Sequence, residues 1–231
     1  MITCGLVGVG QLGAALARQL EGESVHIRAY HPNSQKATEF ARRFYKVRAV
    51  ELAELFGQST ILLALPADGI IPFLKNAQKT IQNDVQPTFV NLSTLVDTKE
   101  LQKEFPDLQI YGVKIIGHAN DLYEHGEGLF VSEPPLDAEG FREVRFLFDK
   151  IGTLLEDKED VVAEVNRLAV RKTLEACISF EKEAGAKNYP ETYSKKAMDT
   201  IFPHIIEHYK EGTLEGFALQ VLNEINAENK K

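Results

Sequence analysis

A glycine-rich segment near the N-terminus constrains the fold more than any other feature of the sequence. Gly8, Gly10 and Gly13 have the spacing G-x-G-x-x-G, directly after the apolar run 2–7 and at the start of a segment whose leucines share one helical face. A second apolar run, 25–30, follows that helix. Strand, glycine turn, helix and strand in this order are typical of the first βαβ unit of a dinucleotide-binding Rossmann fold.

The three glycines have separate roles in such a turn. Gly8 would make the tight turn, Gly10 would let the backbone approach a pyrophosphate, and Gly13 would let the helix pack closely on the strand. Free N–H groups and the helix dipole favour an anion at the helix N-terminus, so Gln11 and Leu12 belong to the same predicted site. The alternative is a glycine turn that binds nothing.

The rest of residues 1–156 repeats the alternation of strands and helices. Apolar runs predict further strands at 60–65, 88–92, 109–116, 129–132 and 153–155, with a weaker one at 46–50. Helical spacing is found between them at 34–44, 70–79, 98–105 and 138–150. Strand–helix alternation predicts a largely parallel sheet covered on both faces, so we expect a Rossmann-type, doubly wound α/β domain.

Residues 157–231 show no strand pattern and predict a small all-α C-terminal domain. The expected helices span 161–184, with Gly185 as its stop, then 191–209 and 214–227. Three helices are too few to enclose a core. They must therefore pack on the first domain or on a second subunit, and their apolar surface favours a homodimer interface.

Composition narrows the classes of partner. A formal net charge of −8 argues against a nucleic acid or an anionic membrane surface. The two cysteines form no disulfide framework, and the first residues do not read as a signal peptide, so we expect a cytoplasmic protein. The most apolar stretch is too short and too interrupted to span a bilayer. His204 and His208 lack further ligands at matching spacing, so no metal site is predicted.

The end of the second strand indicates which dinucleotide is bound. An acidic residue there would accept a hydrogen bond from the ribose 2′-hydroxyl of NAD, but Tyr-His-Pro-Asn-Ser contains none. His31, Asn33 and Ser34 could instead donate to the 2′-phosphate of NADP, with Arg28 or Lys36 as a nearby charge. NADP is therefore favoured and NAD stays open, and a plain turn with a helix cap is the alternative for these residues.

Several further segments carry a family resemblance. They are Ile-Leu-Leu-Ala-Leu-Pro at 61–66, Phe-Val-Asn-Leu-Ser-Thr at 89–94, Gly-Glu-Gly at 126–128 and Gly-Thr-Leu-Glu-Gly-Phe at 212–217. With the glycine turn, they make the chain resemble the pyrroline-5-carboxylate reductase family, within the wider group of Rossmann reductases with helical C-terminal domains. The resemblance implies hydride transfer between NAD(P) and a small C=N or C=O substrate. It also places Leu65, Pro66 and Ser93 at the cofactor, and implies a dimer with pockets where two subunits meet.

The departures from that family affect the substrate pocket. A Ser-Gly-Ser-Gly-Pro-Ala run of the family is replaced by Ala-Glu-Val-Asn-Arg-Leu near 163–168, and its Met-Pro-Asn by Ile-Gly-His at 116–118. Its paired glycines and threonines reduce to Gly212 and Thr213, and the C-terminal domain is shorter. Cofactor binding therefore carries over, whereas proline chemistry does not.

Three residues are candidates for catalysis. His118 follows a strand end and could protonate a carbonyl or imine as hydride arrives, or be a loop histidine without a role. Lys172 resembles the helical lysine acid of hydroxyacid dehydrogenases, or is surface charge. Thr213, expected at a helix N-terminus, could bind a substrate carboxylate or simply cap the helix. Ser93 could orient the nicotinamide or form a turn, and residues 123–125 are expected to be a mobile loop over the cofactor.

Two other functions stay open. Since the substrate motifs are missing, the chain could bind a dinucleotide without catalysis, as a sensor or regulatory protein. It could also be a reductase whose electrons come from another protein or a second cofactor.

Overall fold

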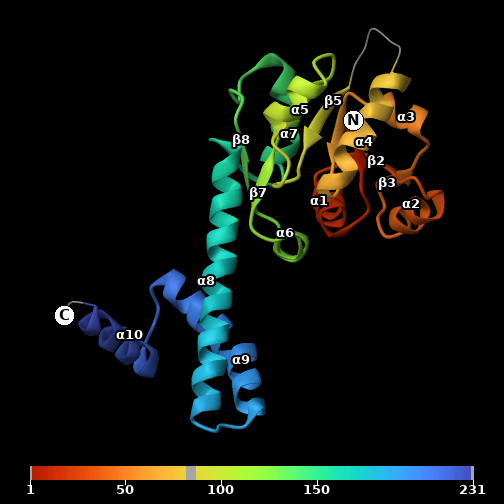
Figure 1. The fold of residues 1–231 in the computed structure, drawn as a ribbon. Helices are drawn as coiled ribbons and strands as arrows, with labels where there is room; N and C mark the ends of the chain where they lie inside the picture. The colour runs from red at the N-terminus through yellow and green to blue at the C-terminus, as the bar shows by residue number, and fades with distance from the viewer. Residues whose placement is uncertain (1, 82–86, 230–231) are drawn as a thin grey trace. The chain divides into compact units, whose positions relative to one another are not determined.

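A computed structural model describes residues 2–81 and 87–229, and the chain divides into two compact units, residues 1–167 and 168–231 (Figure 1). Strands of the first unit are β1 (Ile2–Val7), β2 (Val25–Tyr30), β3 (Val47–Ala49), β4 (Thr60–Leu63), β5 (Thr88–Asn91), β6 (Gln109–Gly112), β7 (Lys114–Ile116), β8 (Gly128–Ser132) and β9 (Gly152–Glu156). Its helices are α1 (Gln11–Gly22), α2 (Ser34–Ala41), α3 (Leu52–Phe56), α4 (Ala67–Thr80), α5 (Thr98–Glu104), α6 (Ala119–His125), α7 (Arg142–Asp149) and the start of α8 (Glu159–Ala186).

Within the described residues, the main sheet has six parallel strands in the order β3-β2-β1-β4-β5-β6. Val7 is in register with Tyr30 and Leu63, and Leu63 is in register with Asn91. The carboxyl ends of β1, β2, β4 and β5 therefore lie at one edge of the sheet. This is the edge at which a doubly wound fold binds its ligand, and the predicted fold class is confirmed.

Both faces of this sheet are covered because the central strands are apolar on both sides. On β4, Leu62 packs with α1 and α7, whereas Ile61 and Leu63 pack with α4 and α5. On β5, Val90 and Phe89 divide between the two faces in the same way. The alternation along each strand thus produces a core above and a core below the sheet, and it holds the glycine turn rigidly at the edge.

The predicted strand 109–116 is wrong as a single element. It divides at Val113, which separates β6 in the main sheet from β7 in a second sheet of order β7-β8-β9. β7 pairs with β8 antiparallel, and β8 pairs with β9 parallel. The Ser132 hydroxyl donates to the Gly112 carbonyl at 2.6 Å, and the Lys114 side chain turns back toward β5. Tertiary hydrogen bonds therefore divide a segment that local pattern predicts as one strand.

Other boundaries also differ from the expected ones. Residues 123–125 belong to α6 and are not a loop, because Leu122 is buried and Gly126, at φ +74°, ends the helix. The short helix α3 gave no periodic signal, and a 3₁₀ turn replaces the first part of the expected helix 138–150. Gly185 lies inside α8, and Asn188 adopts the left-handed conformation beyond its end.

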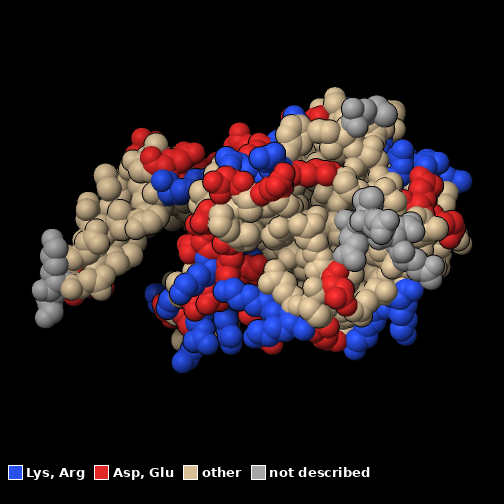
Figure 2. Space-filling model, turned by 90° about the horizontal axis from the view of Figure 1, so that it is seen from above, with Lys and Arg blue, Asp and Glu red and all other residues tan. Residues whose placement is uncertain are grey.

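The second unit contains the rest of α8, then α9 (Glu191–Glu211) and α10 (Gly216–Glu228). Phe180 and Phe202 contact each other with ring centroids 5.3 Å apart. Large apolar side chains are nevertheless exposed, including Ile178 at 64% and Phe217 at 81%. No residue of α10 is buried, and its surface is mostly uncharged (Figure 2). The expected α-helical C-terminal region is confirmed.

Candidate functional site

The glycine turn between β1 and α1 is shaped by backbone contacts that exclude side chains. Gly8 has φ +106°, and a Cβ there would overlap the carbonyl oxygen of Ala64 at the end of β4. A Cβ on Gly13 would overlap the Gly8 carbonyl oxygen. Both glycines are therefore required by the fold itself, because each one lets two segments of backbone approach closely.

Gly10 is different, because nothing in the described chain requires it to be glycine. A Cβ at Gly10 would meet no atom within 4 Å, and its φ of −82° and ψ of −162° are extended and open to any residue. Gly10 is the N-cap of α1, whose N-terminus has no side-chain cap and no acidic residue in its first turn. The first N–H groups of α1 are thus left for an external anion.

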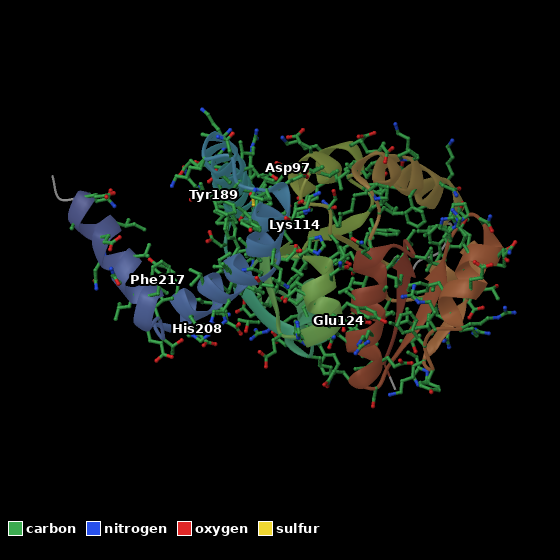
Figure 3. The ribbon with its side chains drawn as sticks, turned by 90° about the horizontal axis from the view of Figure 1, so that it is seen from below. Asp97, Lys114, Glu124, Tyr189, His208 and Phe217 are labelled. Carbon is green, nitrogen blue, oxygen red and sulfur yellow. The ribbon has the colours of Figure 1, made fainter. Side chains whose placement is uncertain are left out.

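Two hollows adjoin Gly10. The first, about 570 Å³, is lined by Gly8, Val9, Gly10, His31, Lys36, Glu39, Phe40, Arg43, Ala64, Leu65 and Pro66. The second, about 580 Å³, is lined by Val9, Gly10, Gln11, Ala14, Arg43, Asn120, Tyr123 and Glu124. Glu124 lies on α6 beside α1 (Figure 3). The first hollow brings together predicted residues that directly follow β1, β2 and β4.

Some of the residues after β2 make hydrogen bonds within the fold, and others keep a donor that a ligand could use. The Asn33 side chain accepts from Lys36 N and caps α2, as the turn-and-cap alternative predicted. His31 Nδ1 accepts from Asn33 N at 2.9 Å, so a neutral imidazole carries its proton on Nε2 and can donate it. Ser34 is the first residue of α2. Arg28, expected as a nearby charge, instead lies 3.4 Å from Glu54.

At the carboxyl end of β5, Ser93 is engaged in a turn. Its N–H donates to Asn91 Oδ1 at 3.1 Å, and its hydroxyl accepts from Leu95 N at 3.4 Å. The Asn91 amide also donates to the Val96 carbonyl and the Thr98 hydroxyl, each at 2.9 Å. The turn role proposed for Ser93 is therefore present, whereas Ser93 is not among the residues lining either hollow.

Lys114 was not singled out in the sequence, yet it organises this edge (Figure 3). It is only 1% exposed, and its Nζ donates to the carbonyls of Ser93 at 2.7 Å and Val96 at 3.1 Å. Nζ also lies 3.3 Å from a carboxylate oxygen of Glu159 on α8. Burial lowers the pKa of the Lys114 ammonium, and the Glu159 carboxylate acts in the opposite direction. A lysine at a strand start gives no local signal of such a role.

His118, the predicted acid, caps α6. Its Nδ1 accepts from Asn120 N at 3.2 Å, which leaves the proton of a neutral ring on Nε2. The strand end before it is held by α8, because Asn166 accepts from Gly117 N and donates to the Ile115 carbonyl. His118 is exposed, and it follows β7 of the second sheet instead of a strand of the main parallel sheet, so it is not at the expected edge and is not among the residues that line either hollow.

Lys172 and Thr213 lie in the second unit. The Lys172 ammonium is 2.8 Å from Glu175 on the same helix face. Thr213 does not stand at a helix N-terminus as expected, since α10 begins at Gly216. It follows the left-handed Gly212 that ends α9, and its N–H and hydroxyl both contact His208. The expectation failed because α10 begins at Gly216, with Glu215 as its N-cap, and not at residue 214 directly after Thr213.

The sequence analysis missed Arg43, which lines the hollows, and Arg18, which contacts a lining residue of the second hollow. Arg43 lines both hollows, and the Arg18 guanidinium lies 4.6 Å from the centre of the Tyr123 ring. Arg18 and Arg43 lower the pKa of the Tyr123 hydroxyl. By contrast, burial raises the pKa of the Cys4 thiol to about 12, so Cys4 is no nucleophile.

Residues 2–81 and 87–229 contain no group of three or more His, Cys, Asp or Glu side chains arranged to hold a metal ion. None of the helices in that part of the chain combines the length and the apolar character that crossing a membrane requires.

Comparisons with known proteins agree with this geometry. Residues 3–90 match the family described as NADP oxidoreductase coenzyme F420-dependent. No curated protein matches the sequence. Among solved structures, Plasmodium falciparum pyrroline carboxylate reductase with NADP bound is 18% identical, with a TM-score of 0.64 over 99% of this chain and 90% of that chain. An imine reductase from Myxococcus stipitatus in complex with NADP+ is 14% identical, with a TM-score of 0.65 over 93% and 79% of the two chains.

A 3-hydroxyisobutyrate dehydrogenase from Salmonella typhimurium gives a similar result, at 15% identity and a TM-score of 0.66, over 92% of this chain and 80% of that chain. Similarity at these identities establishes the fold. Residues 3–90 thus resemble the N-terminal Rossmann domain of that family, and the chain shares the fold of these three solved structures.

Proposed function

We propose that the protein is an NADP(H)-dependent oxidoreductase that transfers hydride between the nicotinamide and a C=N or C=O carbon of a small substrate. The observation that carries this proposal is Gly10. It faces open space at an uncapped helix N-terminus although the fold makes no demand for glycine there. An anion bound by the backbone supplies the missing reason for this residue.

The lining residues fit the parts of such a dinucleotide. The free N–H groups at Gln11 and Leu12 would bind the pyrophosphate, and His31 Nε2 and Lys36 would face the ribose phosphate. Leu65 and Pro66 offer an apolar wall beside the nicotinamide ribose. When bound, the nicotinamide supplies or accepts the hydride, and the chain's own groups position it.

His118 is the best-supported acid in the first unit. Its Nδ1 is committed to the α6 cap, so Nε2 of the neutral ring holds a proton at a defined atom. In a reduction, that proton would pass to the nitrogen or oxygen of the substrate as hydride reaches the carbon. Lys172 and Thr213 remain candidate substrate contacts, supported by the resemblance and not by their surroundings.

Two rival functions also have specific support. Lys172 and Thr213 are engaged with Glu175 and His208, which favours a dinucleotide-binding protein without catalysis. The matched family description names coenzyme F420, which favours a reductase that exchanges electrons with a second cofactor. Under either rival function, Gly10 still gives the dinucleotide pyrophosphate access to the N-terminus of α1.

The experiment begins with titration of NADPH, NADP+ and NAD+ against the full chain by calorimetry. A panel of cyclic imines, ketones and aldehydes is then tested for NADPH oxidation, with a parallel arm that offers coenzyme F420. Turnover of an imine or carbonyl supports the proposal, and turnover with F420 alone supports the second cofactor. Binding without turnover in any arm supports the non-catalytic function, and no binding refutes all three.

Pyrroline-5-carboxylate itself is expected to turn over slowly or not at all. The small-residue loop of the resembled family is replaced here by bulkier residues around 164–168. NADPH oxidation with that substrate measures this directly, and robust turnover would mean that these departures have been given too much weight.

We also propose a cytoplasmic homodimer assembled through the second unit. Leu168, Leu174 and Ile178 on α8 are each more than half exposed, and α10 buries none of its residues. Apolar surface of this extent on helices marks an interface. Sedimentation at micromolar concentration tests the assembly, and a single species of 25.8 kDa would refute the dimer.

A further inference from the structure

Arg43 stands where the two hollows beside Gly10 meet. It lines both of them, as do Val9 and Gly10. Arg43 follows the end of α2, where its N–H donates to the Phe40 carbonyl at 3.1 Å. Its guanidinium lies 5.8 Å from the centre of the Phe40 ring and 5.4 Å from that of Phe44. Stacking on aromatic rings holds the arginine at this place while its N–H groups remain available.

Arg43 and Lys36 are the two cationic side chains that line the first hollow. Arg28 does not contribute, because its guanidinium pairs with Glu54, which also pairs with Arg48. Lys36 lines the hollow and Glu39 opposes it, with one Glu39 carboxylate oxygen accepting from Gln35 Nε2 at 2.9 Å. Two cationic side chains therefore face one carboxylate on the β2 side of the glycine turn.

Helix α6 contributes side chains that line the second hollow together with Arg43. Gln19 of α1 donates to the Leu122 carbonyl at 2.8 Å and fixes α6 against α1. This contact brings the Tyr123 ring under Arg18 and its hydroxyl close to Arg43. Glu124 contributes the one carboxylate among the residues lining this hollow. A cation already placed by two elements loses little freedom when an anion binds.

We propose that Arg43 is the side chain that distinguishes NADP from NAD in this protein, by pairing with the 2′-phosphate. The proposal rests on the dinucleotide-binding function proposed above. The pyrophosphate is already served by the N-terminus of α1, whereas Arg43 shares its hollow with His31 and Lys36 after β2, where the adenosine ribose lies. A planar guanidinium offers the phosphate two parallel N–H donors, which the single donor of a neutral histidine cannot match.

The test compares Arg43→Ala, Arg43→Lys and the matched control Arg42→Ala. Arg42 is the neighbouring exposed arginine, and it is not among the residues lining either hollow. Calorimetric titration of NADP+ and of NAD+ gives both affinities for each protein. Arg43→Ala should lower the affinity for NADP+ by about 10- to 100-fold, as expected for a lost charged hydrogen bond, and change that for NAD+ less than about threefold. Arg43→Lys should fall between, and Arg42→Ala should resemble the wild type.

The other outcomes separate this inference from the function beneath it. Equal losses of affinity for NADP+ and NAD+ in Arg43→Ala would place Arg43 on a part that both cofactors share, and would overturn the assignment. It would also be overturned if Arg43→Ala left both affinities unchanged, or if Arg42→Ala lost as much affinity for NADP+ as Arg43→Ala. A wild type that binds NAD+ but not NADP+ overturns it while the dinucleotide function stands. A wild type that binds neither overturns the proposed function itself.

Discussion

Replacing Gly10 by alanine should separate binding from folding. The new methyl group would meet no atom within 4 Å, and the backbone is in an extended conformation that alanine adopts freely. Alanine is a poorer N-cap than glycine by an amount on the order of 1 kcal/mol. The loss of flexibility in the unfolded chain offsets roughly 0.4–1 kcal/mol of this. Thermal stability should therefore stay close to that of the wild type.

The same methyl group should damage cofactor binding. It would occupy the space through which the pyrophosphate reaches the uncapped N–H groups of α1. Losing one hydrogen bond to a charged group costs about 1.5–3 kcal/mol, which corresponds to a roughly 10- to 150-fold weaker Kd. Calorimetric titration of NADPH measures this loss, and a melting curve on the same sample shows that the variant is folded.

Two further variants make the comparison decisive. Gly13→Ala adds the same methyl group where it overlaps the Gly8 carbonyl oxygen. That overlap should cost about 3 kcal/mol of stability, and the better helix propensity of alanine should recover about 1 kcal/mol. The net loss of about 2 kcal/mol should lower Tm by roughly 4–8 °C. Gly22→Ala, at the other end of α1 and also in open space, is the matched control: it should leave NADPH binding unchanged and raise the free energy of unfolding by no more than about 1 kcal/mol. If folded Gly10→Ala binds NADPH as tightly as Gly22→Ala, the hollow is not the pyrophosphate site.

Three other predictions concern charge. His31→Asp should shift the preference toward NAD+, because a carboxylate repels the 2′-phosphate and accepts a hydrogen bond from the 2′-hydroxyl. Calorimetry with both cofactors checks this. An unchanged ratio of the two affinities counts against placing the adenosine ribose next to His31. Lys114→Ala should destabilise the protein by about 3–5 kcal/mol in denaturant unfolding, since Glu159 loses its buried partner, and a loss below about 1 kcal/mol contradicts this. The hydrogen bond from Lys99 lowers the pKa of Glu133 below its ordinary 4.5, so at acid pH the unfolded chain binds more protons than the folded one, and the free energy of unfolding falls as the pH drops below about 4.5. Glu133→Gln should flatten this dependence. An unchanged profile of unfolding free energy against pH would rule out the effect.

Local pattern was sufficient for much of the first unit. β1 and β2 begin and end where the apolar runs do, because both strands are central, apolar and bounded by a turn. The glycine spacing likewise located the turn and the start of α1, since Gly8 and Gly13 stand where two backbone segments approach too closely for any side chain. These features depend on neighbours in the chain, and a single sequence contains them in full.

Only the tertiary structure decided the features that rest on distant partners. The run 109–116 is predicted as one strand from the sequence, yet it divides because Gly112 and Lys114 bond to different segments, Ser132 and the loop after β5. Arg43 lies well past the β2 end on which the cofactor argument was based, and it reaches the hollow only because α2 returns its side chain toward Gly10. Hydrophobic periodicity reports which face of an element is buried, and this was enough to predict the sheet. Packing between distant elements decides which polar groups meet across the sheet. The charged residues that line the site could therefore be identified only from the tertiary structure.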